Sequence, residues 1–256
     1  MTTVTYADCR GNGARTARGT VIDPATDESA ARAKENVDYS IAFLASVFQR
    51  RDVPDFRCCI NWGSRRANAL WYQKKVMLGS GDNCHRSYTD SLSVIMHEIT
   101  HSLTEDKLAT TDVARTINEH LCDVFGILAR QWRQSQRGEE PDWLFGSEIR
   151  ICPGAAIRNL RVPREDARDP GAMTWPEASF PDDVYFNVGV LNRAFALASD
   201  SIPLPPWQST GKIWHSTLGQ LGWHMDIPGF VNLVIANAGE YEREVVSAFR
   251  AVEFDV

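Results

Sequence analysis

The chain lacks the features that mark nucleic-acid-binding and membrane proteins. Its formal net charge is −6 over 256 residues, and no run of Lys and Arg is longer than two residues. Because phosphate binding needs a concentrated basic surface, we expect no nucleic-acid partner. No apolar run approaches the roughly 18 residues that a membrane helix needs, so we expect no membrane partner either. A composition of 43% hydrophobic and 23% charged residues is that of an ordinary globular protein with a sizeable core.

The sequence also lacks an apolar signal core and a recognisable cysteine framework. It starts with the polar stretch MTTVTYADCRGNG. Its six cysteines form neither a CxxC pair nor an evenly spaced disulfide pattern. Cys58 and Cys59 are neighbours in a strand-like run and would point to opposite faces, so we interpret the cysteines as buried thiols. These features favour a reducing compartment and a cytoplasmic location, and the alternative is a secreted protein whose leader is missing from this sequence.

Hydrophobic periodicity predicts a mixed α/β first half and a mainly helical second half. The stretches DFRCCINW and ANALWYQKKVMLG predict strands, GSGDN predicts a turn, and residues 139–181 predict long loops. We expect an α+β fold of two domains, an N-terminal α/β domain over 1–106 and a mainly helical C-terminal domain over 107–256. Helices are expected over 27–51, 89–107, 112–136, 183–199, 210–222 and 228–250.

The segment VIMHEITHSLT places His97 and His101 four residues apart in one of these helices. Residues four apart share a helix face, so both imidazoles can bind a single metal ion. Zinc is the expected ion, because imidazole suits it and a catalytic zinc site keeps one position open for water. Glu98 stands next to that position and can take a proton from the attacking water. An accidental HExxH in a solvated helix is the alternative.

The following helix, with TINEHLCDVFGIL, offers further ligands. Glu119 follows His101 after a stretch long enough for a loop and an antiparallel return, and its carboxylate can be the third zinc ligand. Asp123 lies one turn later on the same face, where it is suited to accept a hydrogen bond from a ligating imidazole, and Asn118 directly precedes Glu119. A pair of helix-surface carboxylates is the alternative, which the surrounding apolar residues and the upstream HExxH disfavour.

Taken together, these motifs resemble the thermolysin family of zinc metallopeptidases, of the gluzincin type. HEITH followed by NEHLCDVFG matches the HExxH and NExxSD of that family, with Cys122 in place of the usual serine. The resemblance covers nearly the whole chain and implies a two-domain fold with the zinc helix at the floor of the cleft. Further similar segments are NALWYQKKVMLGSGDN, PDWLFGSEI, PGAAIRNL, TGKIWHSTLGQL and EREVVSAFRAV.

The resemblance also implies which residues bind a peptide substrate. Asn68 and Ala69 fall on the edge strand that binds substrate backbone, and a strand edge offers unpaired N–H and C=O groups. Arg158 falls on the arginine that holds the substrate carbonyl. The alternatives are a structural amide for Asn68 and a salt bridge for Arg158. The pocket beside the scissile bond would be lined by apolar residues, which predicts a hydrophobic residue after the cleaved bond: Val94, Phe145, Ile149 and Ile157.

The calcium sites of the family are dismantled in this sequence. Only Asp142 is retained among the positions of acidic calcium ligands that we compare. Calcium needs six to eight oxygen ligands, with carboxylates prominent, so we expect one catalytic zinc ion and no double calcium site. The other positions hold Ser93, Arg130, Leu144 and Ser147.

The catalytic histidine of the family falls on Tyr185, within DDVYFNVGVLNR. The loop EDKLATTDVART also lacks the tyrosine with which the family supports the oxyanion. A preorganised donor at the developing oxyanion is worth a factor of ~10² to 10³ in rate. A neutral phenol can donate a hydrogen bond, so Tyr185 is predicted to be the oxyanion donor, and the alternative is that it only fills space. The remaining histidines are expected to be surface or partly buried residues: His85, His120, His215 and His224.

The leading hypothesis is a zinc-dependent endopeptidase that acts on a peptide or peptide-derived substrate. One alternative is a zinc-dependent tailoring enzyme of narrow specificity that acts on a peptide-derived metabolite. The other is a non-catalytic pseudopeptidase that keeps a structural zinc ion. The intact zinc ligands and Glu98 favour the peptidase, because a decayed enzyme commonly loses one of them.

Overall fold

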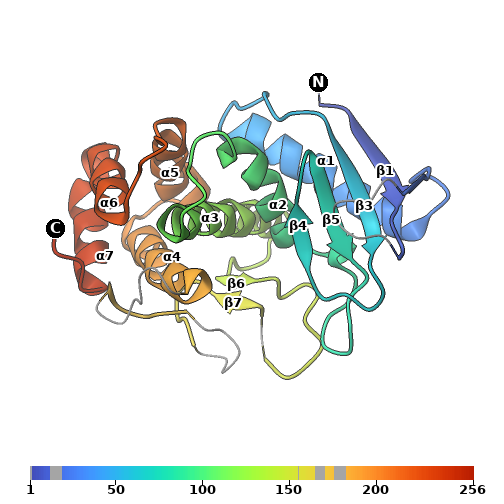
Figure 1. Ribbon diagram of the computed structural model, residues 1–256. Coiled ribbons are helices and arrows are strands. Elements are labelled where there is room, and N and C mark those ends of the chain that lie inside the picture. The colour runs from blue at the N-terminus through green and yellow to red at the C-terminus, as the bar shows by residue number, and fades with distance from the viewer. Residues whose placement is uncertain (1, 12–18, 155, 165–170, 176–182) are drawn as a thin grey trace. The chain divides into compact units, whose positions relative to one another are not determined.

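A computed structural model describes residues 2–11, 19–154, 156–164, 171–175 and 183–256 (Figure 1). The chain divides into two compact units. Unit 1 consists of Met1–Leu103 and the returning segment Gly146–Ala156. Unit 2 consists of Thr104–Phe145 and Ile157–Val256.

Unit 1 is built on a mixed five-stranded sheet with the strand order β2-β1-β3-β5-β4. The central strand β3 pairs in parallel with β1 and β5, and the edge strands β2 and β4 are antiparallel to their neighbours. The residues of β3, FRCCINW, are largely buried, as expected for a central strand with a parallel neighbour on each side. The strands are β1 (Val4–Asp8), β2 (Thr20–Val21), β3 (Phe56–Trp62), β4 (Ala69–Trp71) and β5 (Lys75–Gly79).

The stretch ANALWYQKKVMLG is a hairpin, so the prediction of one continuous strand there is wrong. Tyr72 and Lys75 exchange backbone hydrogen bonds of 2.9 and 3.1 Å and close the turn between β4 and β5. Gln73 and Lys74, between them, have φ of 48° and 57°. Two successive residues with positive φ match the twist of a tight hairpin, which a propensity pattern does not reveal for Gln and Lys.

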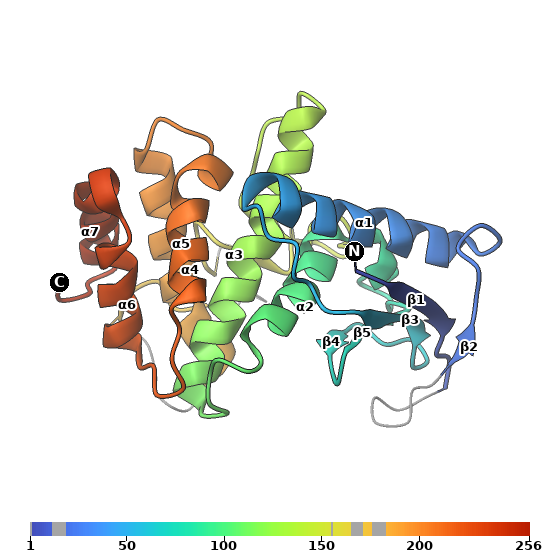
Figure 2. The same ribbon diagram turned by 90° about the horizontal axis from the view of Figure 1, so that it is seen from above.

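Two helices complete unit 1. Helix α1 (Glu28–Val47) begins at Asp27, whose side chain accepts a 2.8 Å hydrogen bond from the backbone N–H of Ala30, and the helix lies along one face of the sheet (Figure 2). Helix α2 (Leu92–Thr104) follows the 3₁₀ turn Tyr88–Asp90. The apolar residues at helical spacing along α2 are buried: Leu92, Ile95, Met96, Ile99 and Leu103.

Cys84 and Cys152 form a disulfide within unit 1, with their Cα atoms 4.5 Å apart. The interpretation of all six cysteines as buried thiols is therefore wrong for this pair. It holds for the other four, which are free and buried: Cys9, Cys58, Cys59 and Cys122. Sequence spacing did not reveal the disulfide, because a separation of 68 residues is bridged only by the return of the chain to unit 1.

Unit 2 is mainly helical. Helix α4 packs against α3 and α7, and α5 contacts α3, α4 and α6. The short strands β6 (Leu144–Phe145) and β7 (Arg158–Asn159) form an antiparallel pair. The helices are α3 (Asp112–Gln136), α4 (Val184–Ser201), α5 (Thr210–Gly219), α6 (Ile227–Ala236) and α7 (Glu242–Ala251), with 3₁₀ turns at Pro206–Gln208 and Gly239–Tyr241.

The last predicted helix, over 228–250, is in fact the two helices α6 and α7. Helix α6 ends at Asn237, and Gly239 adopts a φ of 56° shortly afterwards. This left-handed conformation interrupts the helix, and glycine adopts it at little cost. No helix in the described part of the chain has both the length and the apolarity needed to cross a membrane.

Candidate active site

The HExxH motif lies in α2, where His97 and His101 are placed on one helix face. Their ring centroids are 4.9 Å apart with the planes nearly perpendicular. His97 is 5% exposed and the side chain of His101 is 15% exposed. Two closely spaced, shielded imidazoles are a donor set that suits zinc, so this half of the predicted site fits the metal.

Glu98 is buried in the same helix, with 5% of its surface exposed. Its Oε2 lies 4.0 Å from Nε2 of His101. A carboxylate is seldom buried without a functional or structural reason, since its charge is costly to remove from water. Glu98 therefore stands beside the paired imidazoles, as the motif predicts.

The start of α2 is held by side chains from two parts of unit 1. Ser91 accepts a 3.2 Å hydrogen bond from the backbone N–H of Val94. In the returning segment, Glu148 accepts hydrogen bonds from the N–H of Ser93 at 3.1 Å, and from the hydroxyls of Ser93 and Ser91 at 3.0 and 3.2 Å. A carboxylate at a helix N-terminus also interacts favourably with the helix dipole. These contacts fix the first turn of the helix that carries the histidines.

The further predicted zinc ligand, Glu119, lies on α3 in unit 2 and is partly buried. Helix α3 starts at Thr111, whose side chain accepts a hydrogen bond from Ala114. Asn118, next to Glu119, accepts hydrogen bonds from the hydroxyl of Thr104 at 2.7 Å and from the thiol of Cys122 at 3.5 Å. The amide of Asn118 thus ties the end of α2 to α3 within unit 2.

Asp123 and Arg158 form a buried ion pair in unit 2. Nη2 of Arg158 donates to Oδ1 of Asp123 at 2.5 Å, and Asp123 is fully buried. Asn192 donates to the other oxygen of Asp123 at 2.8 Å. The Arg158 guanidinium also lies over the ring of Phe145, 4.8 Å from its centroid. The salt bridge that was the alternative interpretation of Arg158 is present, and the Arg158 side chain is 16% exposed.

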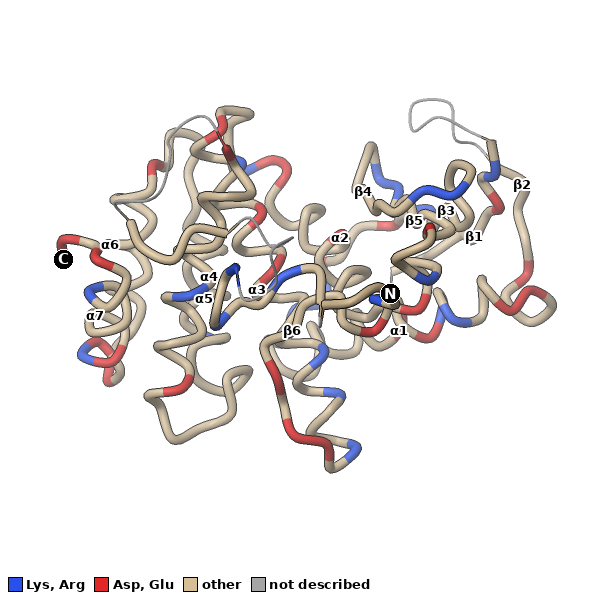
Figure 3. The backbone as a smooth tube through the Cα atoms, turned by 90° about the horizontal axis from the view of Figure 1, so that it is seen from below, with Lys and Arg blue, Asp and Glu red and all other residues tan. Residues whose placement is uncertain are grey.

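The other residues predicted to bind substrate are divided between the units. Ala69 begins the edge strand β4 of unit 1, and Asn68, just before it, is exposed and pairs through its carbonyl with the N–H of Gly79 at 2.9 Å. Val94 and Ile149 are buried in unit 1. In unit 2, Phe145 is buried and Ile157 is half-buried, and they share a 2.9 Å backbone hydrogen bond. Lys and Arg residues gather on the β4–β5 hairpin and the loop before it (Figure 3).

Tyr185 lies in the first turn of α4 and is 46% exposed. The helix begins at Asp183, whose side chain accepts a 3.0 Å hydrogen bond from the N–H of Phe186. Val184, Val190 and Leu191 form a buried face. Tyr185 is therefore the accessible aromatic of an otherwise well-packed helix start.

His120 is fully buried, so the prediction of a surface or partly buried residue is wrong for it. His85 and His215 are partly buried and His224 is exposed, as predicted. Burial lowers the pKa of His120 to about 4, although the hydrogen bond to Asn192 and the charge of Asp123 act in the other direction. The apolar residues around it in sequence were the available signal, because they place His120 on the core side of α3.

Where the family places calcium ligands, Asp142 is bound by a guanidinium. Arg130 contacts both carboxylate oxygens of Asp142, and Gln134 donates to one of them at 3.2 Å. Burial raises the pKa of the Asp142 carboxyl, but the hydrogen bond and charge of Arg130 outweigh it and hold that pKa below its ordinary value. The arginine thus supplies positive charge to the retained acidic residue.

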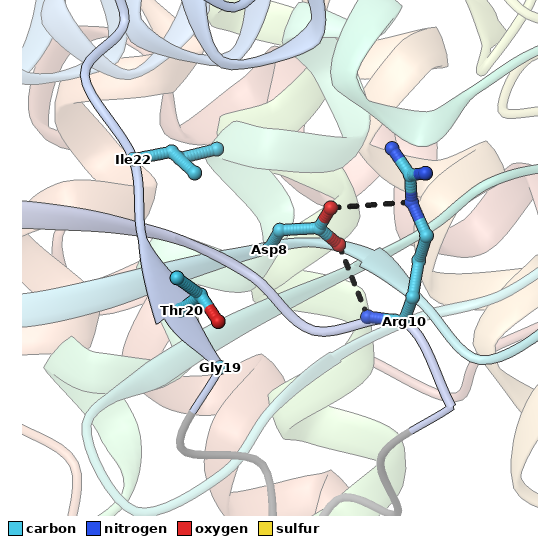
Figure 4. Close-up of a pocket in the computed structure, with 5 residues that line it drawn as sticks. All are labelled: Asp8, Arg10, Gly19, Thr20 and Ile22. Carbon is cyan, nitrogen blue, oxygen red and sulfur yellow. Dashed lines mark hydrogen bonds and ion pairs between the residues drawn. The ribbon is translucent and has the colours of Figure 1, made fainter.

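A pocket of about 520 Å³ opens beside β1 and β2, away from the motif residues (Figure 4). Its lining includes an ion pair between Asp8 and Arg10 at 3.2 Å, with Gly19, Thr20 and Ile22. No imidazole or thiol is among the described residues that line it. The pocket therefore offers no metal-binding chemistry comparable to that of α2.

Comparison with protein families gives two matches that together span nearly the whole chain. Residues 7–105 match the catalytic domain of the thermolysin metallopeptidases, and residues 111–253 match the α-helical domain of the same family. The chain belongs to the thermolysin metallopeptidase family. This confirms the family that the motifs indicated.

The curated relatives that the chain matches include proteases from bacteria. An "Extracellular metalloprotease" of Pectobacterium carotovorum subsp. carotovorum is 29% identical over 195 residues, which cover 69% of this chain and 56% of that protein. "Protease PrtS" of Photorhabdus sp. (strain Az29) is 29% identical over 200 residues, covering 69% and 53%. The chain therefore spans about half the length of the curated relatives that it matches.

The thermolysin-like fold is also found by structural comparison. The structure of the precursor of protealysin, a metalloproteinase from Serratia proteamaculans, matches with a TM-score of 0.86 and 22% sequence identity, covering 98% of this chain and 87% of that one. At this identity the match establishes the fold alone. The predicted two-domain α+β fold is confirmed.

Proposed function

We propose that this protein hydrolyses peptide bonds in a zinc-dependent reaction. The observation that carries the proposal is the group on α2, where the buried carboxylate of Glu98 lies beside the paired rings of His97 and His101. Membership of the thermolysin metallopeptidase family supports it, since the chain matches both domains of that family.

In this proposal His97, His101 and Glu119 hold the zinc ion, with Asn118 and Asp123 beside the third ligand. A bound zinc ion would act as a Lewis acid that polarises the scissile carbonyl and acidifies water. The first two ligands come from one helix face, and the third comes from α3 by analogy with the family motif NExxSD. Calcium has no part in the proposal.

Glu98 is the proposed general base and the subsequent general acid. Its carboxylate takes a proton from the water that attacks the peptide carbonyl, and then delivers it to the leaving amine. Burial serves this function, because the protein surroundings shield the carboxylate from bulk water, which would compete for its proton.

Tyr185 is the proposed donor to the oxyanion. A phenol that only filled space would be expected in the core, whereas Tyr185 is 46% exposed at a capped and otherwise buried helix start. This exposure makes the phenol accessible to a substrate that approaches the start of α4. The gain expected from one such donor is a factor of ~10² to 10³ in kcat.

The proposed substrate is an extended peptide with a hydrophobic residue after the scissile bond. Its backbone would pair with the edge at Asn68 and Ala69, and its carbonyl would accept from Arg158. Ala69 and Leu78 lie opposite each other in the hairpin, between residue pairs that exchange hydrogen bonds, so the polar groups of Ala69 face the free edge of β4. The proposed pocket residues are apolar: Val94, Phe145, Ile149 and Ile157.

The proposal is tested with wild type, Glu98→Gln and Tyr185→Phe on a quenched peptide library, with zinc content measured for each protein. Glu98→Gln should lower kcat by ~10² to 10⁴ and leave the zinc content unchanged. Tyr185→Phe should lower kcat by ~10² to 10³ with a smaller change in KM. Glu105→Gln and Tyr241→Phe are matched controls, and both should leave kcat and KM near the wild-type values.

The outcomes separate the proposal from its alternatives. Full turnover by Tyr185→Phe would remove the oxyanion role while leaving the peptidase intact. Turnover of one small peptide-derived substrate, with none of the library, would favour the tailoring enzyme. The pseudopeptidase would be favoured by two results together. Wild type would bind zinc without any turnover, and Glu98→Gln would leave the biological function unchanged.

We also propose that the protein works in an oxidising compartment. The expectation of a cytoplasmic protein rested in part on the interpretation of the cysteines as thiols, and the disulfide between Cys84 and Cys152 removes that part. The relative from Pectobacterium is named as extracellular. Fractionation of the native host with a specific antibody tests this, and recovery in the cytosol alone would contradict it.

A further inference from the structure

Four buried polar side chains of unit 2 are joined in a row by hydrogen bonds, and this row, or file, ends at the Arg158 ion pair. It joins Trp214 of α5, His120 of α3, Asn192 of α4 and Asp123 of α3, which are between 0 and 1% exposed. Nε1 of Trp214 donates to Nε2 of His120 at 2.8 Å, and Nδ1 of His120 bonds to Oδ1 of Asn192 at 2.7 Å. Nδ2 of Asn192 donates to Oδ2 of Asp123 at 2.8 Å. The three helices lie side by side (Figure 2).

The indole of Trp214 fixes which group donates and which accepts in each hydrogen bond of this file. An indole N–H can only donate, so Nε2 of His120 must be the accepting nitrogen and the proton of the neutral ring lies on Nδ1. That proton points at Oδ1 of Asn192, which leaves the amide nitrogen of Asn192 to face Asp123. Reversal of either His120 or Asn192 would set two donors or two acceptors against each other.

Apolar rings surround the file and hinder water from replacing a lost bond. The ring of Phe230 meets that of His120 edge to face at 5.6 Å between centroids. The ring of Phe195 packs against Trp214 at 5.0 Å. In such surroundings each polar group depends on its protein partner, so the orientation set by Trp214 is passed along the file.

The far end of the file meets the residue that we propose to bind substrate. Asp123 accepts from Asn192 on one oxygen and from Arg158 on the other, at 2.5 Å. If the amide of Asn192 turned over, its oxygen would face the carboxylate and repel it. Asp123 would then rotate, and the guanidinium that it holds over Phe145 would lose its place.

We propose that Trp214 and His120 are positioning residues, which act through Asn192 to fix the orientation of Asp123 and, with it, that of Arg158. The consequence for catalysis rests on the proposed function, in which Arg158 holds the substrate carbonyl. The file carries no net charge before Asp123, so it orients the carboxylate without changing its charge. A donor-only residue at the buried end is what this arrangement requires.

The first test needs no variant. In ¹⁵N-labelled wild type at pH 7, two-bond ¹⁵N–¹H correlations of His120 should show the tautomer that is protonated on Nδ1. A His120 ring protonated on Nε2 would overturn the proposal, since Trp214 could not then donate to it. This measurement is independent of any peptidase activity.

The second test compares Trp214→Phe with the control Trp207→Phe, a buried tryptophan outside the file. Trp214→Phe should produce a mixture of His120 tautomers, broaden the Nε–H resonance of Arg158, and lower kcat/KM on a peptide substrate roughly three- to tenfold. Trp207→Phe should change none of these values.

The third test asks whether the effect passes through Arg158. In an Arg158→Ala background, Trp214→Phe should change kcat/KM by less than about twofold, because the group on which the file acts is gone. The same factor in both backgrounds would show a general structural effect and overturn the proposal. If wild type cleaves no peptide, the proposed function fails, while the His120 and Arg158 resonances still decide the positioning role.

Discussion

The returning segment of unit 1 and the helices of unit 2 use polar contacts in opposite ways. Among its described residues the short segment Gly146–Ala156 buries only the side chains of Ile149 and Ala156, so apolar burial alone gives it little stabilisation. It is attached by the Cys84–Cys152 disulfide, by Glu148 at the start of α2, and by a 2.9 Å hydrogen bond between Arg150 and His85. In unit 2 the helices already bury large aromatic side chains, and the file from Trp214 to Asp123 orients groups within that core.

The difference shows that a buried polar contact has to be interpreted from its surroundings. At the edge of a small unit it replaces missing apolar burial, and its loss should reduce stability. Within a well-packed helical core it selects one arrangement among several of similar packing, and its loss should first be seen in geometry.

Among the changes considered for unit 1, removal of the disulfide should reduce stability most. A cross-link over 68 residues is expected to stabilise the fold by about 4 kcal/mol, mainly by restricting the unfolded chain. The Cys84→Ala/Cys152→Ala variant should show this loss in denaturant unfolding, and wild type in reductant should match it. Thiol titration in denaturant should find four free thiols in wild type, and an unfolding midpoint insensitive to reductant would contradict the prediction.

Acid should weaken unit 2 through His120. Its pKa of about 4 in the folded protein lies below the ordinary histidine value of about 6.5, so the unfolded chain takes up the proton first. The contribution of neutral His120 is complete above pH ~6.5 and is lost as the pH falls towards 4, in total about 3 kcal/mol. The unfolding free energy measured from pH 7 to 4 should show this slope.

A variant without the titrating ring checks the assignment of that slope. His120→Gln should be less stable at pH 7 and should lack the part of the slope that belongs to this residue. His224→Gln, at an exposed position, is the matched control and should keep the wild-type slope. Equal slopes for wild type and His120→Gln would count against the buried neutral ring.

Glu148 should have a smaller effect on stability. Glu148→Ala removes the acceptor for the N–H of Ser93 and for two hydroxyls, with an expected cost of about 1–2 kcal/mol, as for other lost helix caps. Hydrogen exchange of the amides in the first turn of α2 should increase more than exchange in α3. Uniform acceleration of exchange in both helices would argue against a local role.

Calcium should have the smallest effect. A site with a Kd of 10 μM would stabilise the protein by about 2.7 kcal/mol in 1 mM calcium, and we expect no such shift because Arg130 contacts both oxygens of Asp142. Thermal unfolding with calcium or with a calcium-selective chelator should coincide. Arg130→Gln provides the sharper test, because it frees the carboxylate of Asp142. Calcium-dependent stabilisation of wild type would contradict the expectation.

Much of the fold followed from local pattern. The apolar spacing in α2 and α3 predicted the two long helices that carry the motif residues, and the predicted range of α3 agrees with its observed bounds. The pattern missed the turn at Gln73 and Lys74 and the break before Gly239, because both depend on backbone conformations that neighbouring apolar residues do not encode. Motif spacing indicated the family, which the comparisons confirm.

The residue types and their spacing were enough to indicate the family, the helix that presents His97, Glu98 and His101, and the absence of a basic run suited to nucleic acid. Those features depend on residue type and on periods of a few residues, which the backbone converts directly into a helix face. The folded chain was needed to establish which cysteines pair, that His120 is buried, and that Trp214, Asn192 and Asp123 share one file with it. Trp214 and His120 are 94 residues apart in the chain, and their contact is created by the packing of helices, which no local period records.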